Sequence, residues 1–562
     1  MAGGVKRVAS VVTRRVGNFY HLNFLGLAFG LYGYFLALTP TLMPRNAFYL
    51  GLIAGLGFAI GYGIGVLVSY IWRWLRVPEP TPAIKSQTWR TALPLFAMLI
   101  ITFGFEAASW QNEVRLLVGE EPLDGASIGN VVWVSFVTLT VVLLVSRLIR
   151  GLTHIIKRQV AKVRILPRKL VTLLSVGIVS ALLVMVFNGV FVDSFKDFAN
   201  KTYSTANDRD KPGVEPVTSS LRSGGPDSAV SWHSLGREGR SFVATGPSQA
   251  DIAEFTGREA AEPIRVYAGY LSAETLQERA ALAVEELERT GAFDRQILVV
   301  MTATGSGWIE PQTADALEYM WGGDSALVTI QYSYLPSWMS LIFNQKDATD
   351  AGRLLFEAVY ERWSQLPEDE RPKLIAYGLS LGSFGSQAAF SSASDYLQRT
   401  DGALYAGTPS FAEPWKRFTT DRDSGSPQIL PVYQDGQTLR FAATIDDIMS
   451  TEPGPWGQPR VLYLQHPSDP VVWWNPDLIL QKPDWLSETR GYDVSPRMQW
   501  YPFITFIQVT IDQFFGVDVP NGHGHNYPPT IVNAWRAVTQ PDNWTDAENA
   551  KLQELINQYE RS

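Results

Sequence analysis

The sequence predicts a bundle of five membrane-spanning helices followed by an α/β domain with a mainly parallel sheet. The first third of the 562-residue chain contains five apolar stretches, most of them close to the ~20 residues that cross a bilayer core of ~30 Å. The rest alternates short apolar strands with amphipathic helices, which is typical of a parallel sheet covered on both faces. The charge divides the chain in the same way. Residues 1–192 hold 18 Lys+Arg and 6 Asp+Glu, whereas the remainder holds 29 and 49.

The sequence indicates a transmembrane helix more strongly for some of the five stretches than for others. They are Phe19–Leu42, Ala47–Tyr70, Thr91–Ala108, Ile128–Val145 and Leu170–Val192. The third is the weakest, with Pro94 near its start and Glu106 near its end, so a buried or re-entrant helix is the alternative. The second carries glycines at four-residue spacing, which predicts a face for close helix packing.

The basic residues of the loops predict the orientation. With five spans, every basic loop falls on one side of the membrane. These loops contain Lys6, Arg7, Arg14, Arg15, Arg73, Arg76, Lys85, Arg90, Arg147, Arg150, Lys157, Arg158, Lys162, Arg164, Arg168 and Lys169. The opposite loops hold only Arg45 and Arg115, and Arg115 lies among acidic residues that include Glu113 and Asp124. We therefore expect a multi-pass cell-membrane protein with a cytoplasmic N-terminus and everything after Val192 outside.

These patterns divide the chain into a transmembrane domain at 1–192, a Gly/Ser/Pro-rich linker segment at 193–226 and a catalytic domain at 227–562. The net charge of the part after residue 192 is −20, which argues against a nucleic-acid partner because phosphate binding needs a basic face. The chain has no cysteine, so disulfides, thiolate nucleophiles and Cys-based zinc sites are excluded. The oligomeric state does not follow from these patterns.

The α/β part has six predicted strands, at Ile264–Gly269, Gln296–Met301, Ala326–Ile330, Lys373–Tyr377, Ala403–Ala406 and Val461–Leu464. Helices are expected at Ala273–Thr290, Thr313–Trp321, Ala348–Ser364, Ser383–Phe390, near Phe503–Phe515, from Pro528 onward and at Asp546–Tyr559. Two stretches, Phe411–Gln458 and the Trp-rich Trp473–Trp500, interrupt the alternation. We interpret them as candidates for a cap over the site.

A G-x-S-x-G motif joins the fourth strand to its helix, with Ser380 between Gly378 and Gly382. A serine at a sharp strand-to-helix turn is the nucleophile elbow of α/β-hydrolases. Two residues without Cβ let the helix approach the strand closely and hold the hydroxyl out. An incidental serine in a glycine-rich turn is the alternative, but the flanking strand and helix favour the elbow.

A serine nucleophile needs a base and an acid, which follow it in the order Asp/Glu, then His in this fold. The chain after the elbow contains His466, His523 and His525. We favour His525 as the base, because it ends a G-x-G-H pattern and an aromatic follows, and His523 is the alternative base. Asp469, just past the last predicted strand, is the expected acid, and the weaker candidates are Asp446, Asp447 and Asp477.

The oxyanion of the intermediate needs backbone N–H donors. We expect one from Leu381, after the nucleophile, and one from Ser306 or Gly307, in the glycine-containing loop after the second strand. His523 and His525, at i and i+2, also raise the possibility of a metal. Without an evident third ligand, zinc is the poorer interpretation, so no metal and no cofactor are expected.

A basic multi-span N-terminal part joined to the motifs GLSLGS, HPSDPVVWW and GHGHNY resembles the bacterial membrane-anchored α/β-hydrolase family common in actinobacteria. The resemblance covers nearly the whole chain. It implies a transmembrane N-terminal half, a serine-hydrolase fold in the C-terminal half, and Ser380, Asp469 and His525 (or His523) at the positions of the triad. It implies no substrate.

The motifs together predict a membrane-anchored serine hydrolase (an esterase or lipase) or acyltransferase that acts on acyl esters at the extracytoplasmic face of the cell envelope. The anchor and the aromatics of the C-terminal half favour a lipid ester as substrate, with an acyl cleft formed from Trp338, Phe343, Trp415, Trp473, Trp474 and Trp485. Hydrolysis and transfer share an acyl-enzyme and are not separable from the sequence. The alternative is a non-catalytic cell-envelope scaffold that retains the fold.

Overall fold

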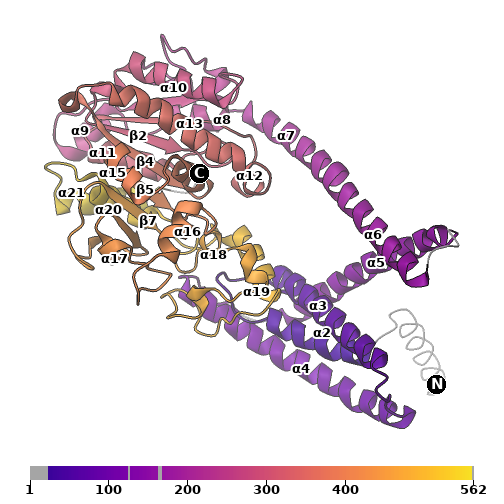
Figure 1. The fold of residues 1–562 in the computed structure, drawn as a ribbon. Helices are drawn as coiled ribbons and strands as arrows, with labels where there is room; N and C mark the ends of the chain where they lie inside the picture. Colours follow the sequence, from indigo (N-terminus) through magenta and orange to yellow (C-terminus); the bar gives the residue numbers. More distant parts are fainter. Residues whose placement is uncertain (1–22, 124–126, 163–166, 560–562) are drawn as a thin grey trace. The chain divides into compact units, whose positions relative to one another are not determined.

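The computed structural model describes residues 23–123, 127–162 and 167–559 (Figure 1). They form two compact units. The first contains the chain up to Val184, together with Pro476–Lys482 and Val494–Phe515, and the second contains the remainder. Some of the residues on which the predicted orientation depends lie outside the described residues: the basic Lys6, Arg7, Arg14, Arg15 and Arg164 and the acidic Asp124.

The N-terminal part is α-helical, as predicted. Its helices are α2 (Phe24–Ala37), α3 (Ala47–Trp74), α4 (Pro82–Leu117), α5 (Ile128–Val160) and α6 (Arg168–Val186). Within the described ranges, four helices are long and apolar enough to cross a membrane: Ala47–Trp74, Ser86–Leu117, Ile128–Val160 and Arg168–Asn207. Helix α2 has 14 residues, and the predicted start of its span at Phe19 is not among the described residues. The chain is thus a membrane protein with several apolar helices.

Two expectations about individual spans can be compared with the structure. The third span, the weakest in the sequence, is one continuous helix of 36 residues that includes Pro94, as membrane helices tolerate. The glycines of α3 pack closely against the neighbouring helices. A Cβ on Gly57 would overlap the backbone of Gly33 in α2, and the Ser135 hydroxyl of α5 donates to the carbonyl of Gly51 over 2.9 Å.

The first unit also contains a segment from the C-terminal half of the chain. Helix α19 (Ile504–Asp512) packs against α2 and α3. The guanidinium Nε of Arg45 donates to Asp512 over 2.8 Å, and both side chains are fully buried. A buried charge needs such a partner. A late segment of the chain therefore belongs to the same compact unit as the apolar N-terminal helices, which composition does not reveal.

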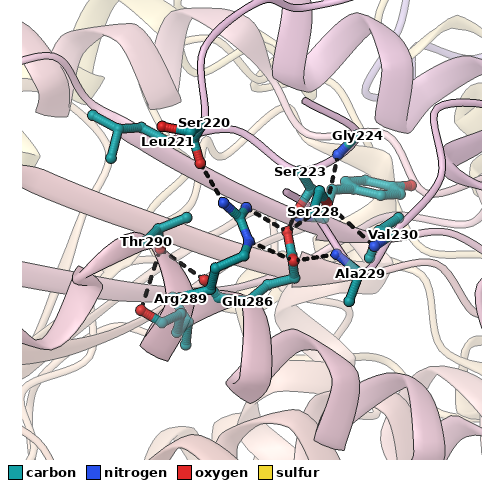
Figure 2. A network of polar contacts seen from close by, with 12 residues as sticks. Ser220, Leu221, Ser223, Gly224, Ser228, Ala229, Val230, Glu286, Arg289 and Thr290 are labelled. Carbon is teal, nitrogen blue, oxygen red and sulfur yellow. Dashed lines mark hydrogen bonds and ion pairs between the residues drawn. The ribbon is translucent and has the colours of Figure 1, made fainter. Parts of the chain in front are cut away.

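The segment expected to be a linker is ordered and partly helical. After the π-helical turn η1 (Phe187–Val192), α7 extends over Asp193–Asn207. Further on, the chain docks onto α10 (Leu276–Thr290) through Glu286 (Figure 2). The carboxylate of Glu286 accepts hydrogen bonds from the hydroxyls of Ser223 and Ser228, at 2.9 and 2.8 Å. Ser223 is fully buried, so this stretch is part of the second unit's core.

The second unit is built on a seven-stranded, entirely parallel sheet in the order β1-β3-β2-β4-β5-β7-β6. The strands are β1 (Ile264–Ala268), β2 (Ile297–Thr302), β3 (Ser325–Ile330), β4 (Lys373–Leu379), β5 (Gly402–Ala406), β6 (Leu439–Ala442) and β7 (Arg460–Leu464). Nearly every strand residue is buried, so both faces of the sheet are covered. The predicted fold class is confirmed.

Two groups of helices cover this sheet. One consists of α10, α13 (Gln345–Ser364) and α14 (Leu381–Ser386), and the other of α11 (Pro311–Met320), α20 (Pro528–Thr539) and α21 (Asp546–Asn557) (Figure 1). The remaining helices are α8 (Gly236–Ala244), α9 (Gln249–Thr256), α12 (Ser337–Phe343), α15 (Ala393–Arg399), α16 (Glu413–Thr420), α17 (Ile445–Met449) and α18 (Pro470–Trp473). Helix α10 begins later than predicted because a capping box of Thr275 and Glu278 fixes its start.

The two stretches interpreted as a cap, Phe411–Gln458 and Trp473–Trp500, also contribute to other parts of the fold. Phe411–Gln458 contains β6, which adds the edge strand next to β7. This strand has only four residues, and so short a run carries little periodic signal. The Trp-rich stretch is divided between the units, because Pro483–Asp493 belongs to the second and both flanking segments belong to the first.

Candidate active site

The strand β4 ends in a strained turn at Ser380. This residue has φ 56° and ψ −124°, a conformation that costs a non-glycine residue about 1–3 kcal/mol and is typical of functional sites. Its N–H donates to the carbonyl of Ala406, at the end of β5, over 2.8 Å. Ser380 immediately precedes α14, so the strand, the serine and the helix form the predicted elbow.

The two glycines of the elbow are sterically required. A Cβ on Gly378 would overlap the backbone of Gly382, and a Cβ on Gly382 would overlap the carbonyl of Thr302, at the end of β2. Helix α14 therefore lies against β4 and β2 at a distance that no side chain permits. This is the close approach inferred from the motif.

The carboxylate of Asp469 is completely buried and accepts four hydrogen bonds. It lies five residues beyond β7, where it caps α18 through the N–H groups of Val471 and Val472. Its other oxygen accepts from the Tyr527 hydroxyl, at 2.6 Å, and from the Nδ1–H of His525, at 2.7 Å. Because the carboxylate can only accept, it fixes the tautomer in which Nδ1 of His525 carries the proton.

The His525 side chain, 9% exposed, lies beside the end of β5. A Cβ on Gly407, the residue after β5, would overlap its imidazole. Since Ser380 binds the carbonyl of the preceding Ala406, the structure brings Ser380, Asp469 and His525 to the carboxyl edge of the sheet. The Nε2 atom of His525 is buried and has no hydrogen-bond partner within the described part of the chain.

His523, the alternative base, has an acid of its own. Its Nδ1 lies 3.1 Å from a carboxylate oxygen of Asp493, and its side chain is 22% exposed. Asp493 is buried and also accepts from the Ser468 hydroxyl over 2.6 Å. Asp493 is not among the predicted site residues, because it lies in no recognisable motif. The histidines at i and i+2 were the available signal, because two imidazoles so close in sequence can each require a carboxylate.

His466 holds the loop that carries both histidines. Its Nδ1–H donates to the carbonyl of Gly524 over 2.9 Å, and its ring stacks on Tyr527 at 4.3 Å between centroids. Burial lowers the pKa of His466 below its usual value, which favours the neutral imidazole. Tyr527, the aromatic that follows His525 in the sequence, therefore contacts both Asp469 and His466.

The weaker candidates for the acid lie elsewhere. Asp447 caps α17 in a capping box with Thr444, and Asp446 is exposed on the same helix. Asp477 lies in the short segment that belongs to the first unit. The acids that the structure does place beside His523 and His525 are Asp493 and Asp469.

The two predicted sources of oxyanion donors differ in whether their N–H groups are already hydrogen-bonded. The N–H of Leu381 opens α14 and has no hydrogen-bond acceptor in the described structure. In the loop after β2, the N–H of Gly307 donates to the carbonyl of Thr304 over 2.7 Å. Because this hydrogen bond uses the Gly307 N–H, that group is not free to donate to the oxyanion. The N–H of Ser306 has no such acceptor among the described residues, so it is the better candidate of the two.

Half of the aromatics expected to form an acyl cleft belong to the core. Trp415, Trp473 and Trp485 are at most 3% exposed and pack on one another. Phe343 packs against Phe195 of α7. The expectation for the three buried Trp side chains was wrong, because an aromatic between motifs can equally well fill the interior. Phe343 is partly exposed. Trp338 is 44% exposed and Trp474 is partly exposed.

The other candidate sites in the described residues lack an evident set of catalytic groups. No group of three or more His, Asp or Glu side chains is arranged to hold a metal ion in the part of the chain that the structure describes. A cavity of about 700 Å³ is lined by residues that include Arg440, Trp456, Arg460 and Arg536. Arg460 begins β7, so the cavity lies at the amino edge of the sheet, opposite the elbow. It contains no histidine.

Comparisons with known proteins agree with this architecture. Residues 264–552 match the model of a family described as "Alpha/beta-hydrolase family", and residues 38–247 match that of its N-terminus, "Alpha/beta-hydrolase family N-terminus". No curated protein and no solved structure matches the chain.

The two His–Asp pairs predict different outcomes for two matched variants. His525→Ala removes the imidazole held by Asp469, so we expect the turnover of p-nitrophenyl acetate to fall by about 10⁴-fold or more, as in other triads. His523→Ala should retain turnover within about ten-fold of the wild type, because its imidazole has a separate acid. Circular dichroism and thermal unfolding verify that both variants fold. Near-normal turnover in His525→Ala, with a large loss in His523→Ala, would reverse the assignment.

Proposed function

The chain belongs to this alpha/beta-hydrolase family, and we propose that it is a membrane-anchored serine hydrolase or acyltransferase that cleaves acyl esters with the triad Ser380, His525 and Asp469. The family generally suggests hydrolase activity. The observation that carries the proposal is the buried Asp469–His525 pair. The Nε2 atom of His525 has no partner within the described structure. The pair lies at the end of β5, where the carbonyl of Ala406 accepts the N–H of the strained Ser380. A non-catalytic scaffold would not need a buried carboxylate to align a histidine.

In the proposed reaction the Ser380 hydroxyl attacks the ester carbonyl carbon while its proton passes to Nε2 of His525. The carbonyl oxygen becomes the oxyanion and accepts from the N–H groups of Leu381 and Ser306. When the tetrahedral intermediate collapses, the leaving alcohol takes the proton from Nε2, and the acyl group stays on Ser380. Asp469 remains ionised throughout and holds the Nδ1–H.

The second half of the reaction regenerates the serine. A water molecule or an acceptor hydroxyl gives its proton to Nε2 of His525 and attacks the acyl carbon, and the proton then returns to Ser380. Water gives hydrolysis, and a hydroxyl of another molecule gives transfer.

Membrane lipid esters are the substrate class that we favour. Several apolar helices hold the chain in a bilayer. A row of partly exposed aromatics follows the elbow: Phe384 lies 5.4 Å from Phe411, which lies 6.1 Å from Trp474, between ring centroids. All three belong to the second unit. An acyl chain that crosses this row would bury apolar surface, which favours long chains over short ones.

The Trp474 ring provides a test of the substrate class. The enzyme should cleave p-nitrophenyl dodecanoate with a higher kcat/KM than the acetate, and Trp474→Ala should reduce this ratio by about ten-fold because a large apolar contact is lost. Trp456→Ala, at the amino edge of the sheet, is the control and should leave the ratio unchanged. Exclusive cleavage of short-chain esters, with a ratio that Trp474→Ala does not alter, would eliminate the lipid proposal.

The orientation rests on the loop charges, and we propose that the second unit lies on the extracytoplasmic side of the cell membrane. Since the chain contains no cysteine, single cysteines report sidedness cleanly. Cysteine at the exposed Gln159, in the last turn of α5, should be protected from an impermeant maleimide in intact cells. Cysteine at the exposed Glu554, in α21, should react once any outer barrier is opened. The opposite labelling pattern would place the second unit in the cytoplasm.

A further inference from the structure

Gln331, the residue after β3, has a buried side-chain amide that hydrogen-bonds to several different segments of the chain. It is fully buried, and its Oε1 accepts the N–H of Tyr270 over 3.1 Å. Its Nε2 shares two N–H groups among three oxygens: the carbonyl of Ser306 at 2.7 Å, the carbonyl of Ser333 at 3.1 Å and the side-chain oxygen of Asn207 at 3.1 Å. An amide at the centre of so many hydrogen bonds fixes the groups that surround it.

One of these groups is the loop after β2, which the proposed function uses for the oxyanion. The carbonyl of Ser306 accepts from Gln331, and the N–H of the same peptide group, on Gly307, donates to the carbonyl of Thr304. The next carbonyl, of Gly307, accepts from the buried Tyr267 hydroxyl over 2.9 Å. Both carbonyls are therefore fixed from β1 and β3. The Ser306 N–H belongs to the preceding peptide group, which is joined to the fixed one through the Cα of Ser306. Fixing the Ser306 carbonyl therefore restricts the orientations that this N–H can adopt.

A second group is Asn207, the last residue of α7. Its side-chain oxygen accepts from Gln331 and from the N–H of Arg237 at 3.3 Å, and its backbone carbonyl accepts from Arg240 at 3.0 Å. Asn207 is 6% exposed. Helix α7 continues the last apolar helix along the chain, because the helical segment extends over Arg168–Asn207. The end of this segment and the loop after β2 thus share one donor, the amide of Gln331.

We propose that Gln331 is a positioning residue that holds the Ser306 N–H of the oxyanion loop in place, and that Asn207 makes this positioning depend on the end of the helix leaving the membrane. The proposal rests on the proposed function. A carboxylate at position 331 could still accept from Tyr270 but could not donate to any of the three oxygens. The loop would lose its anchor while the volume of the side chain stayed the same.

The variant Gln331→Glu tests this role in the full-length protein in detergent. We expect kcat for p-nitrophenyl esters to fall by about 10²-fold with KM within about two-fold, because an oxyanion donor acts in the transition state. Hydrogen exchange of residues 303–308 should become faster. Asn549→Asp makes the same amide-to-acid change in a buried network of α21, where Asn549 donates to Asn533 over 2.9 Å, and it should alter neither readout.

A milder variant keeps the test informative if Gln331→Glu fails to fold. Asn207→Ala leaves the bond between Gln331 and Ser306 intact, so we expect a smaller loss of kcat, about three- to ten-fold, and faster exchange in the same loop. Unchanged exchange at 303–308 in the folded variants, or a loss that lies in KM and not in kcat, would overturn the inference. An inactive wild type would refute the proposed function instead, and the exchange measurement would still decide whether Gln331 holds the loop.

Discussion

The buried carboxylate of Asp469 is the constraint on which the candidate site depends. A charge removed from water must be satisfied by hydrogen bonds at nearly every lone pair. Here the donors are the N–H groups of α18, the Tyr527 hydroxyl and the imidazole of His525. These groups come from both ends of the stretch between β7 and α20. The need to satisfy one anion therefore explains why the loop before α20 closes over the end of β7 and presents a histidine there.

A second layer of polar contacts supports this loop. The Ser468 hydroxyl accepts the N–H of Gly524 over 2.8 Å and donates to Asp493. His466 binds the carbonyl of the same Gly524. Gly524, the residue before His525, is thus held through both its N–H and its carbonyl. Because Asp493 also serves His523, the two His–Asp pairs share one framework, in which the more buried pair is the proposed catalytic one.

Much of the fold and the main features of the site follow from local sequence. The elbow was recognisable because steric rules require glycine on both sides of Ser380, and six of the seven strands were visible as apolar runs. The partners that the sequence did not reveal are long-range: Asp493 for His523, Asp512 for Arg45 and Gln331 for Ser306. No periodicity or motif encodes such pairs. The buried Trp residues were misassigned for a related reason, since composition does not distinguish a core aromatic from one that lines a cleft.

The central claim is that Ser380 is the nucleophile, and mass spectrometry of a covalent adduct tests it most directly. The full-length protein would be treated with a fluorophosphonate, digested and mapped, with Ser380→Ala treated in parallel. We expect a single phosphonyl adduct on the peptide that contains Ser380, and none in the variant. An adduct on another residue, such as Ser306 or Ser383, or ester turnover that persists in Ser380→Ala, would contradict it.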